Sequence, residues 1–291
     1  MAERAGTARR TSKFLEPESR VVVRSRVLGA EQISPNFVRV TVGGSQVSAL
    51  APVGFDQWFR MFFVEKGSGT GSEALHLPVA SDDRWWPEYR DMPDDLRPIL
   101  RNYTIRRYRV AGSGRFGDTA EIEIDFASHG DLGPASTWAN AVSAGEELGL
   151  LDEGIRYHPS DGAQWQLLVA DESALPAVAA ILDTLAETDP RAAVEVFAEV
   201  PHPGDLTAQQ LWVGENVRVH PVIRTDPDVR PGVLATEAVR AAELPDAPAY
   251  AFVAGESDLA TGVRRHLVRE RGRPKSSVKF TGYWKYGEPV Y

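Results

Sequence analysis

Residues 101–107 read RNYTIRR, and the rest of the chain is best explained around this short stretch. Tyr103 and Ile105 are strand-forming residues at a spacing of two, so they share one face of a strand, and Thr104 and Arg106 share the other. Arginine offers a planar fork of donors for phosphate, threonine adds a small donor and acceptor, and tyrosine adds a flat face. The stretch therefore suits an aromatic ligand with a diphosphate, although a basic surface strand has the same pattern.

A second stretch, SHGDLGPASTW at residues 128–138, predicts a turn that leads into a helix. It follows EIEIDFA at 121–127, whose alternation of apolar and acidic residues is typical of a half-buried strand. Gly130 and Gly133 break the chain, and Pro134 suits the first helical turn. The free N–H groups and positive dipole of a helix start favour a diphosphate, but an ordinary strand–turn–helix connection would look the same.

Together, the two stretches resemble the siderophore-interacting protein family, whose members are flavin-dependent ferric-siderophore reductases related to ferredoxin reductases. The resemblance rests on an Arg-x-Tyr-Thr-x-Arg strand and on the later His-Gly and Gly-Pro-Ala-Ser-x-Trp, and it covers most of the chain, from about residue 20 to residue 287. It implies a fold of two parts. An N-terminal antiparallel FAD-binding β-barrel is followed by a ferredoxin-reductase-like parallel α/β domain that binds NAD(P)H.

The composition limits the function classes. With 291 residues, the chain is long enough for two domains. Its net charge of −9 argues against binding to nucleic acid or to an anionic membrane, since both need a basic surface. No apolar run has the length of a membrane span and no signal peptide is visible, so we expect a cytoplasmic protein, as a monomer. Cysteine is absent, so redox chemistry would need a bound organic cofactor, and no metal site is predicted.

The pattern of predicted strands and helices changes near Gly154. Before it, short strands separated by glycine-rich turns predict a barrel or sandwich over residues 19–154, after a flexible tail at 1–18. A polar, turn-rich linker is expected at 155–164. Beyond it, apolar strands alternate with helical segments, which predicts a parallel α/β layer over 165–291.

The resemblance assigns the flavin site residue by residue. It gives Arg101 and Arg106 the diphosphate or ribityl contacts, lets Tyr103 pack on the isoalloxazine, and places the Thr104 hydroxyl near the reactive N5, as the candidate catalytic group. Arg107 is expected to be solvated, as is Arg109. The second wall of the site would be formed by His129, Gly130, Gly133, Pro134, Ala135 and Ser136.

The resemblance also implies a nicotinamide site at two turns. The first is ADESALPA at residues 170–177, which follows a buried strand, and the second is AGES at residues 254–257, at the end of a later predicted strand. Ligands of open α/β sheets bind at such strand ends, although capped helices alone would explain both turns. No Gly-x-Gly-x-x-Gly is present, which argues against a standard dinucleotide-binding fingerprint. The expected cofactor contacts are Asp171, Glu172, Ser173, Ala174, Gly255 and Glu256.

The C-terminal GYWKYG at 282–287 resembles the ending of the family, with Lys285 where arginine is usual. Trp284 would cover part of the flavin site, although an aromatic tail closing a core is an equal alternative. For an anionic substrate, Arg60 is the first candidate docking residue and Lys285 the second, because an acidic protein needs local positive charge there.

The leading functional hypothesis is an enzyme that passes electrons from NAD(P)H through FAD to ferric siderophores and releases iron as Fe(II). The alternatives are a general flavin reductase or electron-transfer flavoprotein, and a flavin- or siderophore-binding protein without turnover. The choice between NADH and NADPH stays open: Glu199 would favour a ribose hydroxyl, and Arg224 would accept a 2′-phosphate.

Overall fold

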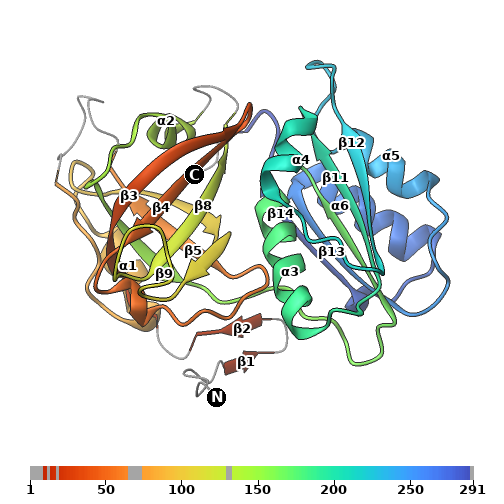
Figure 1. The fold of residues 1–291 in the computed structure, drawn as a ribbon, viewed down its shortest axis with the longest axis horizontal. Helices are drawn as coiled ribbons and strands as arrows, with labels where there is room; N and C mark the ends of the chain where they lie inside the picture. Colours follow the sequence, from red (N-terminus) through yellow and green to blue (C-terminus); the bar gives the residue numbers. More distant parts are fainter. Residues whose placement is uncertain (1–8, 12–13, 18–19, 65–73, 129–132, 289–291) are drawn as a thin grey trace. The chain divides into compact units, whose positions relative to one another are not determined.

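The computed structural model describes residues 9–11, 14–17, 20–64, 74–128 and 133–288. The chain divides into two compact units, which are described separately below (Figure 1). The first is built mainly from residues 1–32 and 37–156, and the second mainly from residues 33–36 and 157–290. Among the described residues, no helix has both the length and the apolar character needed to cross a bilayer.

The first unit is organised around a seven-stranded sheet in the order β6-β5-β9-β3-β4-β8-β7. Its core is apolar and includes buried valines of β4 and isoleucines of β8. The recorded pairings β5–β6, β5–β9, β3–β9, β4–β8 and β7–β8 are antiparallel. The elements are β3 (Val23–Ser34), β4 (Phe37–Gly43), β5 (Trp58–Phe63), α1 (Trp85–Arg90), β6 (Ile99–Thr104), β7 (Arg107–Arg109), β8 (Glu121–Ala127), α2 (Pro134–Ala141) and β9 (Glu147–Asp152).

The two edges of this sheet meet at the RNYTIRR stretch. The N–H of Ile105 donates to the carbonyl of Gln57, just before β5, whereas the next N–H, of Arg106, donates to the carbonyl of Glu123 in β8. Consecutive residues therefore bond to opposite edges of the sheet, which gives the unit its barrel-like form. The single strand predicted at 101–107 is in fact two strands, because the chain must turn from one edge to the other.

Strand β8 was expected to bury one face, but its acidic side chains are buried as well. The carboxylate of Glu123 forms ion pairs with Arg107 and Arg109, at N–O distances of 3.3 and 3.1 Å. Asp125 holds the Arg39 guanidinium through two bonds of 2.7 Å. The prediction that Arg107 and Arg109 are solvated is therefore wrong, because buried carboxylates of the neighbouring strand need cationic partners.

The N-terminal residues, predicted as part of a flexible tail, include two short antiparallel strands, β1 (Arg9–Thr11) and β2 (Phe14–Glu16). Leu15 also exchanges backbone hydrogen bonds with Ile155. At that point Gly154 has a φ of 77°, and a Cβ there would lie 1.9 Å from the Leu15 carbonyl oxygen. Only glycine fits this close approach of the two backbones.

The second unit is a five-stranded parallel sheet in the order β12-β11-β10-β13-β14, with helices on both faces (Figure 1). All six residues of the predicted central strand are buried. One face of α3, with Leu175, Val178, Leu182 and Leu185, is buried too, as the apolar spacing of these residues favours. The elements are β10 (Trp165–Ala170), α3 (Leu175–Thr188), β11 (Val194–Val200), α4 (Pro203–Gln209), β12 (Val217–Ile223), α5 (Val233–Ala241), β13 (Ala249–Glu256), α6 (Ser257–Arg265), the π-helical turn η3 (His266–Glu270) and β14 (Val278–Trp284).

The order of the strands reverses next to β10. The chain passes from β10 to β11 and β12 on one side, and then crosses to β13 and β14 on the other. In open α/β sheets, ligands bind outside the carboxyl ends of the strands at such a switch point. The turns after β10 and β13 meet there, and these are the two turns that the sequence predicts as nicotinamide contacts.

Candidate functional site

The two predicted flavin motifs lie side by side in the first unit, joined by a row of aromatic rings. The Tyr103 ring of β6 packs on Phe126 of β8, with ring centroids 4.3 Å apart, and Phe126 packs on Trp138 of α2 at 5.7 Å. Trp138 is buried in the core of the unit. Burial also raises the pKa of the Tyr103 phenol above its ordinary value, so this ring stays neutral.

The start of α2 is open to an anionic ligand. Pro134 fills the first turn, and the N-cap residue Gly133 makes no side-chain cap. The Ser136 and Thr137 hydroxyls donate to the carbonyls of Ala127 and Gly133, at 3.4 and 3.1 Å. A Cβ on Gly133 would meet no described atom within 4 Å. As far as the described residues go, the first N–H groups of α2 have no side-chain cap, and such groups suit a diphosphate.

The arginines of the first motif are placed differently from one another. Arg101 is half-buried and donates to the Leu100 carbonyl at 2.7 Å. Thr104, at the end of β6, is 8% exposed, whereas Arg106 is 1% exposed. This burial argues against the predicted phosphate contact of Arg106 and favours a role inside the unit.

Two further predicted residues of this site, His129 and Gly130, lie outside the described part of the chain. Ala135, predicted for the same site, is buried in the first turn of α2.

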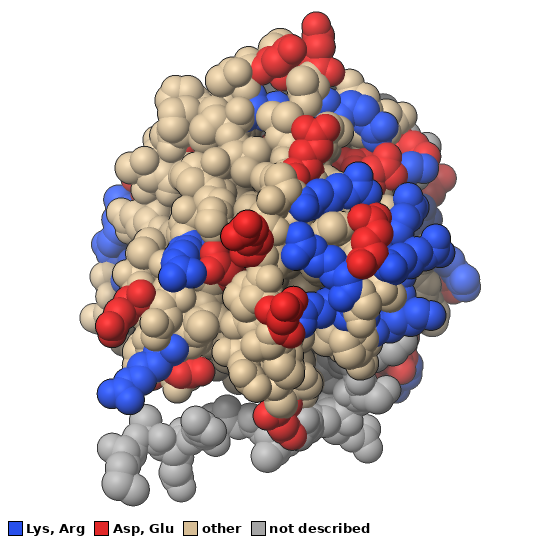
Figure 2. All heavy atoms as spheres, turned by 90° about the vertical axis from the view of Figure 1, so that its right-hand side faces the viewer, with Lys and Arg blue, Asp and Glu red and all other residues tan. Residues whose placement is uncertain are grey.

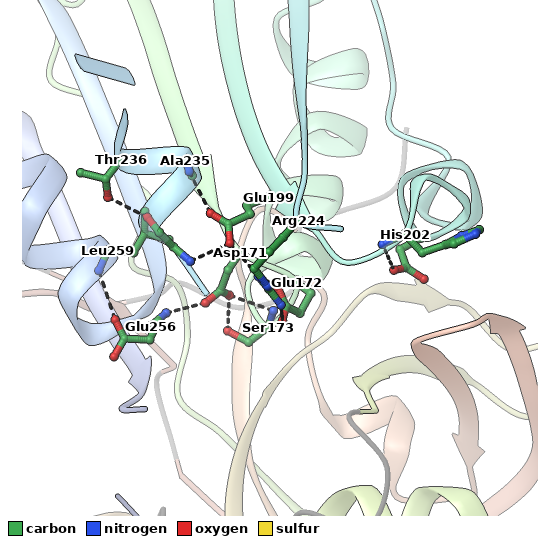
Figure 3. Close-up of polar contacts among 12 residues, drawn as sticks. Asp171, Glu172, Ser173, Glu199, His202, Arg224, Ala235, Thr236, Glu256 and Leu259 are labelled. Carbon is green, nitrogen blue, oxygen red and sulfur yellow. Dashed lines mark hydrogen bonds and ion pairs between the residues drawn. The ribbon is translucent and has the colours of Figure 1, made fainter. Parts of the chain in front are cut away.

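In the second unit, the switch point is filled by the side chain of Asp171 (Figure 3). Its Oδ1 accepts from the Ser173 N–H and hydroxyl, at 2.9 and 2.5 Å. Its Oδ2 accepts from the Glu256 N–H at 2.6 Å and from the Trp284 indole N–H at 3.1 Å. Asp171 is fully buried, and its carboxylate joins the ends of β10, β13 and β14 to the turn before α3.

This carboxylate has an unusual environment. Burial, and then the negative charge of Glu172, raise the pKa of Asp171 to about 7. Gly255 of β13 has a φ of 134°, and a Cβ at this position would lie 2.6 Å from the Asp171 carboxylate. Glycine is therefore required at 255 both by the backbone conformation and by the space that Asp171 occupies.

Next to Asp171 lies a buried ion-pair network centred on Arg224 (Figure 3). Its guanidinium donates to both oxygens of Glu172, at 2.7 and 3.2 Å, and to Glu199 Oε1 at 2.6 Å. Glu199 also accepts the N–H groups of Gly232 and Ala235, each at 2.8 Å, and so caps α5. The sequence offered Glu199 as a partner for a ribose hydroxyl and Arg224 as a partner for a 2′-phosphate. Because these two side chains form an ion pair with each other, the structure does not favour either role.

Glu256 is the N-cap of α6. Its Oε2 accepts the N–H groups of Asp258 and Leu259, at 2.5 and 3.3 Å. Its Oε1 accepts the N–H of Tyr286 at 3.1 Å. The hydroxyl of Ser257 instead donates to the carbonyl of Trp284 at 2.9 Å. Together with the bond from Trp284 to Asp171, these contacts tie residues 284–286 to the switch point.

The acids expected to contact nicotinamide are thus supporting groups. Asp171, Glu172 and Glu256 are each 0% exposed, and their oxygens accept donors from the chain itself. Ser173 is partly exposed and Ala174 is buried at the N-cap of α3. The sequence holds a partial signal for the Arg224 network that the prediction missed: Glu172, Glu199 and Arg224 lie at or just after the carboxyl ends of three strands, β10, β11 and β12, which are neighbours in the sheet.

The candidate docking residues are already paired. Arg60 in β5 makes an ion pair with the buried Glu153, and its guanidinium lies 5.1 Å from the centroid of Trp85. Glu153 also pairs with Arg20 at 3.4 Å. Lys285 pairs with Glu288 on the surface. Neither cation is therefore an isolated charge, which weakens the argument for both as anion-docking residues.

Both units of the chain match known protein families. The sequence profile of the siderophore-interacting protein family matches residues 163–287, and that of the siderophore-interacting FAD-binding domain matches residues 26–156. This chain belongs to the siderophore-interacting protein family. The crystal structure of a siderophore utilization protein from T. fusca, another match, is 30% identical with a TM-score of 0.74, covering 93% of this chain and 97% of that one.

Characterised relatives are similar over most or part of the chain. The ferric vibriobactin reductase of Vibrio cholerae is 29% identical over 88% of this chain and 86% of its own length. The NADPH-dependent ferric-chelate reductase of Escherichia coli is 31% identical over 60% of this chain and 61% of its own length. The mycobactin import ATP-binding/permease protein of Mycolicibacterium thermoresistibile is 27% identical over 92% of this chain, which is 25% of that longer protein.

The fold of this chain is also similar to that of proteins with much lower sequence identity. A ferredoxin reductase of carbazole 1,9a-dioxygenase has a TM-score of 0.62 at 16% identity, over 90% of this chain and 69% of that one. The predicted fold class, an antiparallel FAD-binding barrel-like part followed by a ferredoxin-reductase-like parallel α/β part, is confirmed. Within the described residues, the switch point of the second unit and the start of α2 in the first are the two places that the sequence predicts as cofactor contacts.

Proposed function

We propose that this chain is an FAD-dependent reductase that passes electrons from NAD(P)H to ferric siderophores and releases the iron as Fe(II). The observation that carries the proposal is the pairing of an open helix start next to the Tyr103–Phe126–Trp138 row with a parallel α/β unit of the same family. The ferric reductases of Vibrio cholerae and Escherichia coli support the choice of substrate and of electron donor.

The residues of the first unit suit FAD, as the uncapped start of α2 indicates. Arg101 and the N–H groups at Ala135 and Ser136 would hold the diphosphate, where the charge of the ligand meets the positive end of the helix. Thr104 would place its hydroxyl at the reacting edge of the ring system. Bound FAD would supply a two-electron acceptor that can give its electrons up singly. The protein therefore needs no metal ligand of its own.

In the second unit, we place the nicotinamide nucleotide at the carboxyl ends of β10 and β13. Ser173 and the backbone around Gly255 would line its site, while Asp171 and Glu256 hold these segments in place. This division keeps buried carboxylates away from direct contact with an anionic nucleotide. Trp284, held by Asp171, would close the site from the C-terminal side.

Iron chemistry explains why electron transfer would release the metal. Fe(III) prefers hard oxygen ligands, and a lower charge on the metal weakens their hold. NAD(P)H is an intracellular reductant, so we propose that the reaction takes place in the cytoplasm. We also propose that the protein acts as a monomer and without a nucleic-acid partner. Arg60 stays a proposed docking residue for an anionic chelate, together with Lys285, despite their ion pairs.

The test is an anaerobic assay of the purified, FAD-loaded protein with NADPH or NADH and a ferric siderophore, with a ferrous chelator to trap the product. We expect nucleotide-dependent formation of Fe(II) and release of FAD, not FMN, when the protein is denatured. A protein that reduces added free flavin but no ferric chelate would be a general flavin reductase. A protein whose flavin is not reduced by either nucleotide would be a binding protein.

A further inference from the structure

Charge is strongly segregated within the second unit. Residues 157–263 contain seventeen Asp or Glu and five Lys or Arg, whereas residues 264–279 contain seven Lys or Arg and one Glu. The net charge of −9 conceals this basic segment, which spans the end of α6, η3 and the beginning of β14. The prediction that the chain avoids anionic surfaces used the net charge, but attraction at contact depends on local charge.

Two guanidiniums of this segment are held by carbonyl oxygens and a histidine ring, and neither has a carboxylate partner among the described residues. Arg271 donates to the carbonyl of Ala242 at 2.7 Å and to the His266 ring at 3.0 Å. Arg273 donates to the carbonyls of Asp246 and Ala247, at 2.9 and 2.8 Å. Carbonyl oxygens fix the position of a guanidinium but leave its full positive charge, so both cations remain available to an anion.

The neighbouring cations reach the solvent. Arg265, Arg269 and Lys275 are exposed, and none of them makes an ion pair within the described part of the chain. Lys and Arg side chains gather over one half of the face of this unit that Figure 2 shows. In β14, Phe280 is 38% exposed, with the guanidinium of Arg264, the first arginine of the basic segment, 4.6 Å from its ring centroid. We call Arg265, Arg269, Arg271, Arg273 and Lys275 the basic patch.

The basic patch lies at the end of the unit opposite to the switch point. The residues that bind Arg273 come just before β13, and Arg273 lies 6.0 Å from the ring centroid of Trp165, at the start of β10. Asp171 and Glu256 lie at the other ends of these parallel strands. A partner on the basic patch would therefore leave the proposed nucleotide site free.

We infer that the basic patch docks the protein on an anionic membrane surface. Arginine forks match the phosphate groups of lipids, and a partly exposed aromatic ring beside them suits the interface. A second, independent observation favours a membrane over another polyanion: in the Mycolicibacterium relative, the region matched by this chain is part of an import protein with a permease. In that relative a peptide link holds the matched region close to the permease, and electrostatic docking would bring a separate chain equally close to the membrane surface. The inference does not depend on the proposed reaction.

The experiment is co-sedimentation of the full FAD-loaded chain with vesicles of phosphatidylcholine mixed with phosphatidylglycerol, and with vesicles of phosphatidylcholine alone. Binding is expected only to the anionic vesicles, and it should vanish toward about 1 M salt, where charges are screened within about 3 Å. The variant Arg265→Glu/Arg269→Glu/Lys275→Glu should bind at least about a hundredfold more weakly. The variant with glutamine at the same three positions should lose a smaller part of the binding.

The matched control is Arg84→Glu/Arg90→Glu/Arg191→Glu, which makes the same change of net charge at exposed positions elsewhere. It should keep nearly the full affinity for anionic vesicles, and reductase activity in solution should be unchanged in all three variants. Absence of vesicle binding at low salt would overturn the inference. Equal losses in the control would also overturn it, since net charge alone would then explain the binding. Tighter binding to a random DNA duplex than to anionic vesicles would do the same.

Discussion

The two units of this protein use their predicted motif residues in opposite ways. In the first unit, the motif at α2 leaves N–H groups uncapped, and the Tyr103 ring lies beside it in the aromatic row. In the second unit, Asp171, Glu172 and Glu256 are fully buried, and the chain itself supplies their donors. A sequence motif can thus mark where a site lies without marking which atoms touch the ligand. Burial and hydrogen-bond saturation separate the two cases.

The largest test of this contrast is Arg224→Ala. Its removal would leave Glu172 and Glu199 buried without their cation, and breaking one partner of a buried ion pair costs about 3–5 kcal/mol. We expect a loss of this size in the free energy of unfolding, measured with denaturant. Arg218→Ala, which breaks an exposed pair with Glu195, should cost at most about 1 kcal/mol. Equal effects would mean that the network is not a support of the second unit.

A second test uses the titration of Asp171. Folding raises its pKa from 3.8 to about 7, so the folded state holds the proton more tightly than the unfolded state. The stability contribution of Asp171 should therefore fall as pH rises from about 4 to about 7, by roughly 1.4 kcal/mol for each unit of the shift. In Asp171→Asn this dependence disappears. Denaturant unfolding of both proteins across this range checks it, and a constant difference between them would contradict the buried carboxyl.

The third test concerns the first unit. Arg101→Ala should weaken FAD binding about 10- to 150-fold, because the loss of a charge-assisted phosphate contact costs about 1.5–3 kcal/mol. The stability of the flavin-free protein should change little. Arg107→Ala is the neighbouring control, since Arg107 forms an ion pair with Glu123 and is not among the predicted flavin contacts. Fluorescence titration with FAD measures both variants, and full affinity in Arg101→Ala would remove this residue from the site.

A smaller effect is expected at Thr104, which is 8% exposed at the end of β6. If its hydroxyl lies at the reacting edge of the flavin, Thr104→Val should slow single-turnover flavin reduction about tenfold while FAD binding changes little. Rapid mixing with NADPH measures the rate and titration measures the binding. An unchanged rate would refute the placement.

The smallest expected effect is at Arg60, because Glu153 already offsets its charge. Arg60→Ala should raise the KM for an anionic ferric chelate by a few-fold at most, and leave that for a neutral chelate unchanged. The double variant Arg60→Ala/Glu153→Gln separates docking from pairing. If it restores the wild-type KM, the residues act on each other and not on the substrate.

The fold was predictable where the sequence carries periodic signals. The parallel strands and the buried face of α3 follow from apolar runs, and the family follows from two motifs. The division of 101–107 into two strands was not predictable, because it depends on which strands meet at the edges of the sheet. The pairing of Arg107 with Glu123 depends on a contact between two strands, which no local pattern contains. The Arg224 network was missed because the charges at or just after the ends of three strands point to one another only once the strand order is known.

The central claim, electron transfer from NAD(P)H to a ferric siderophore through the flavin of this chain, is tested most directly by anaerobic double-mixing stopped flow. The FAD-loaded protein is mixed first with NADPH or NADH and then with a ferric siderophore, while the flavin absorbance is followed. We expect the absorbance to bleach on the first mixing and to return on the second, with two ferric ions reduced for each flavin. Absorbance that bleaches but does not return with any ferric siderophore would contradict the account.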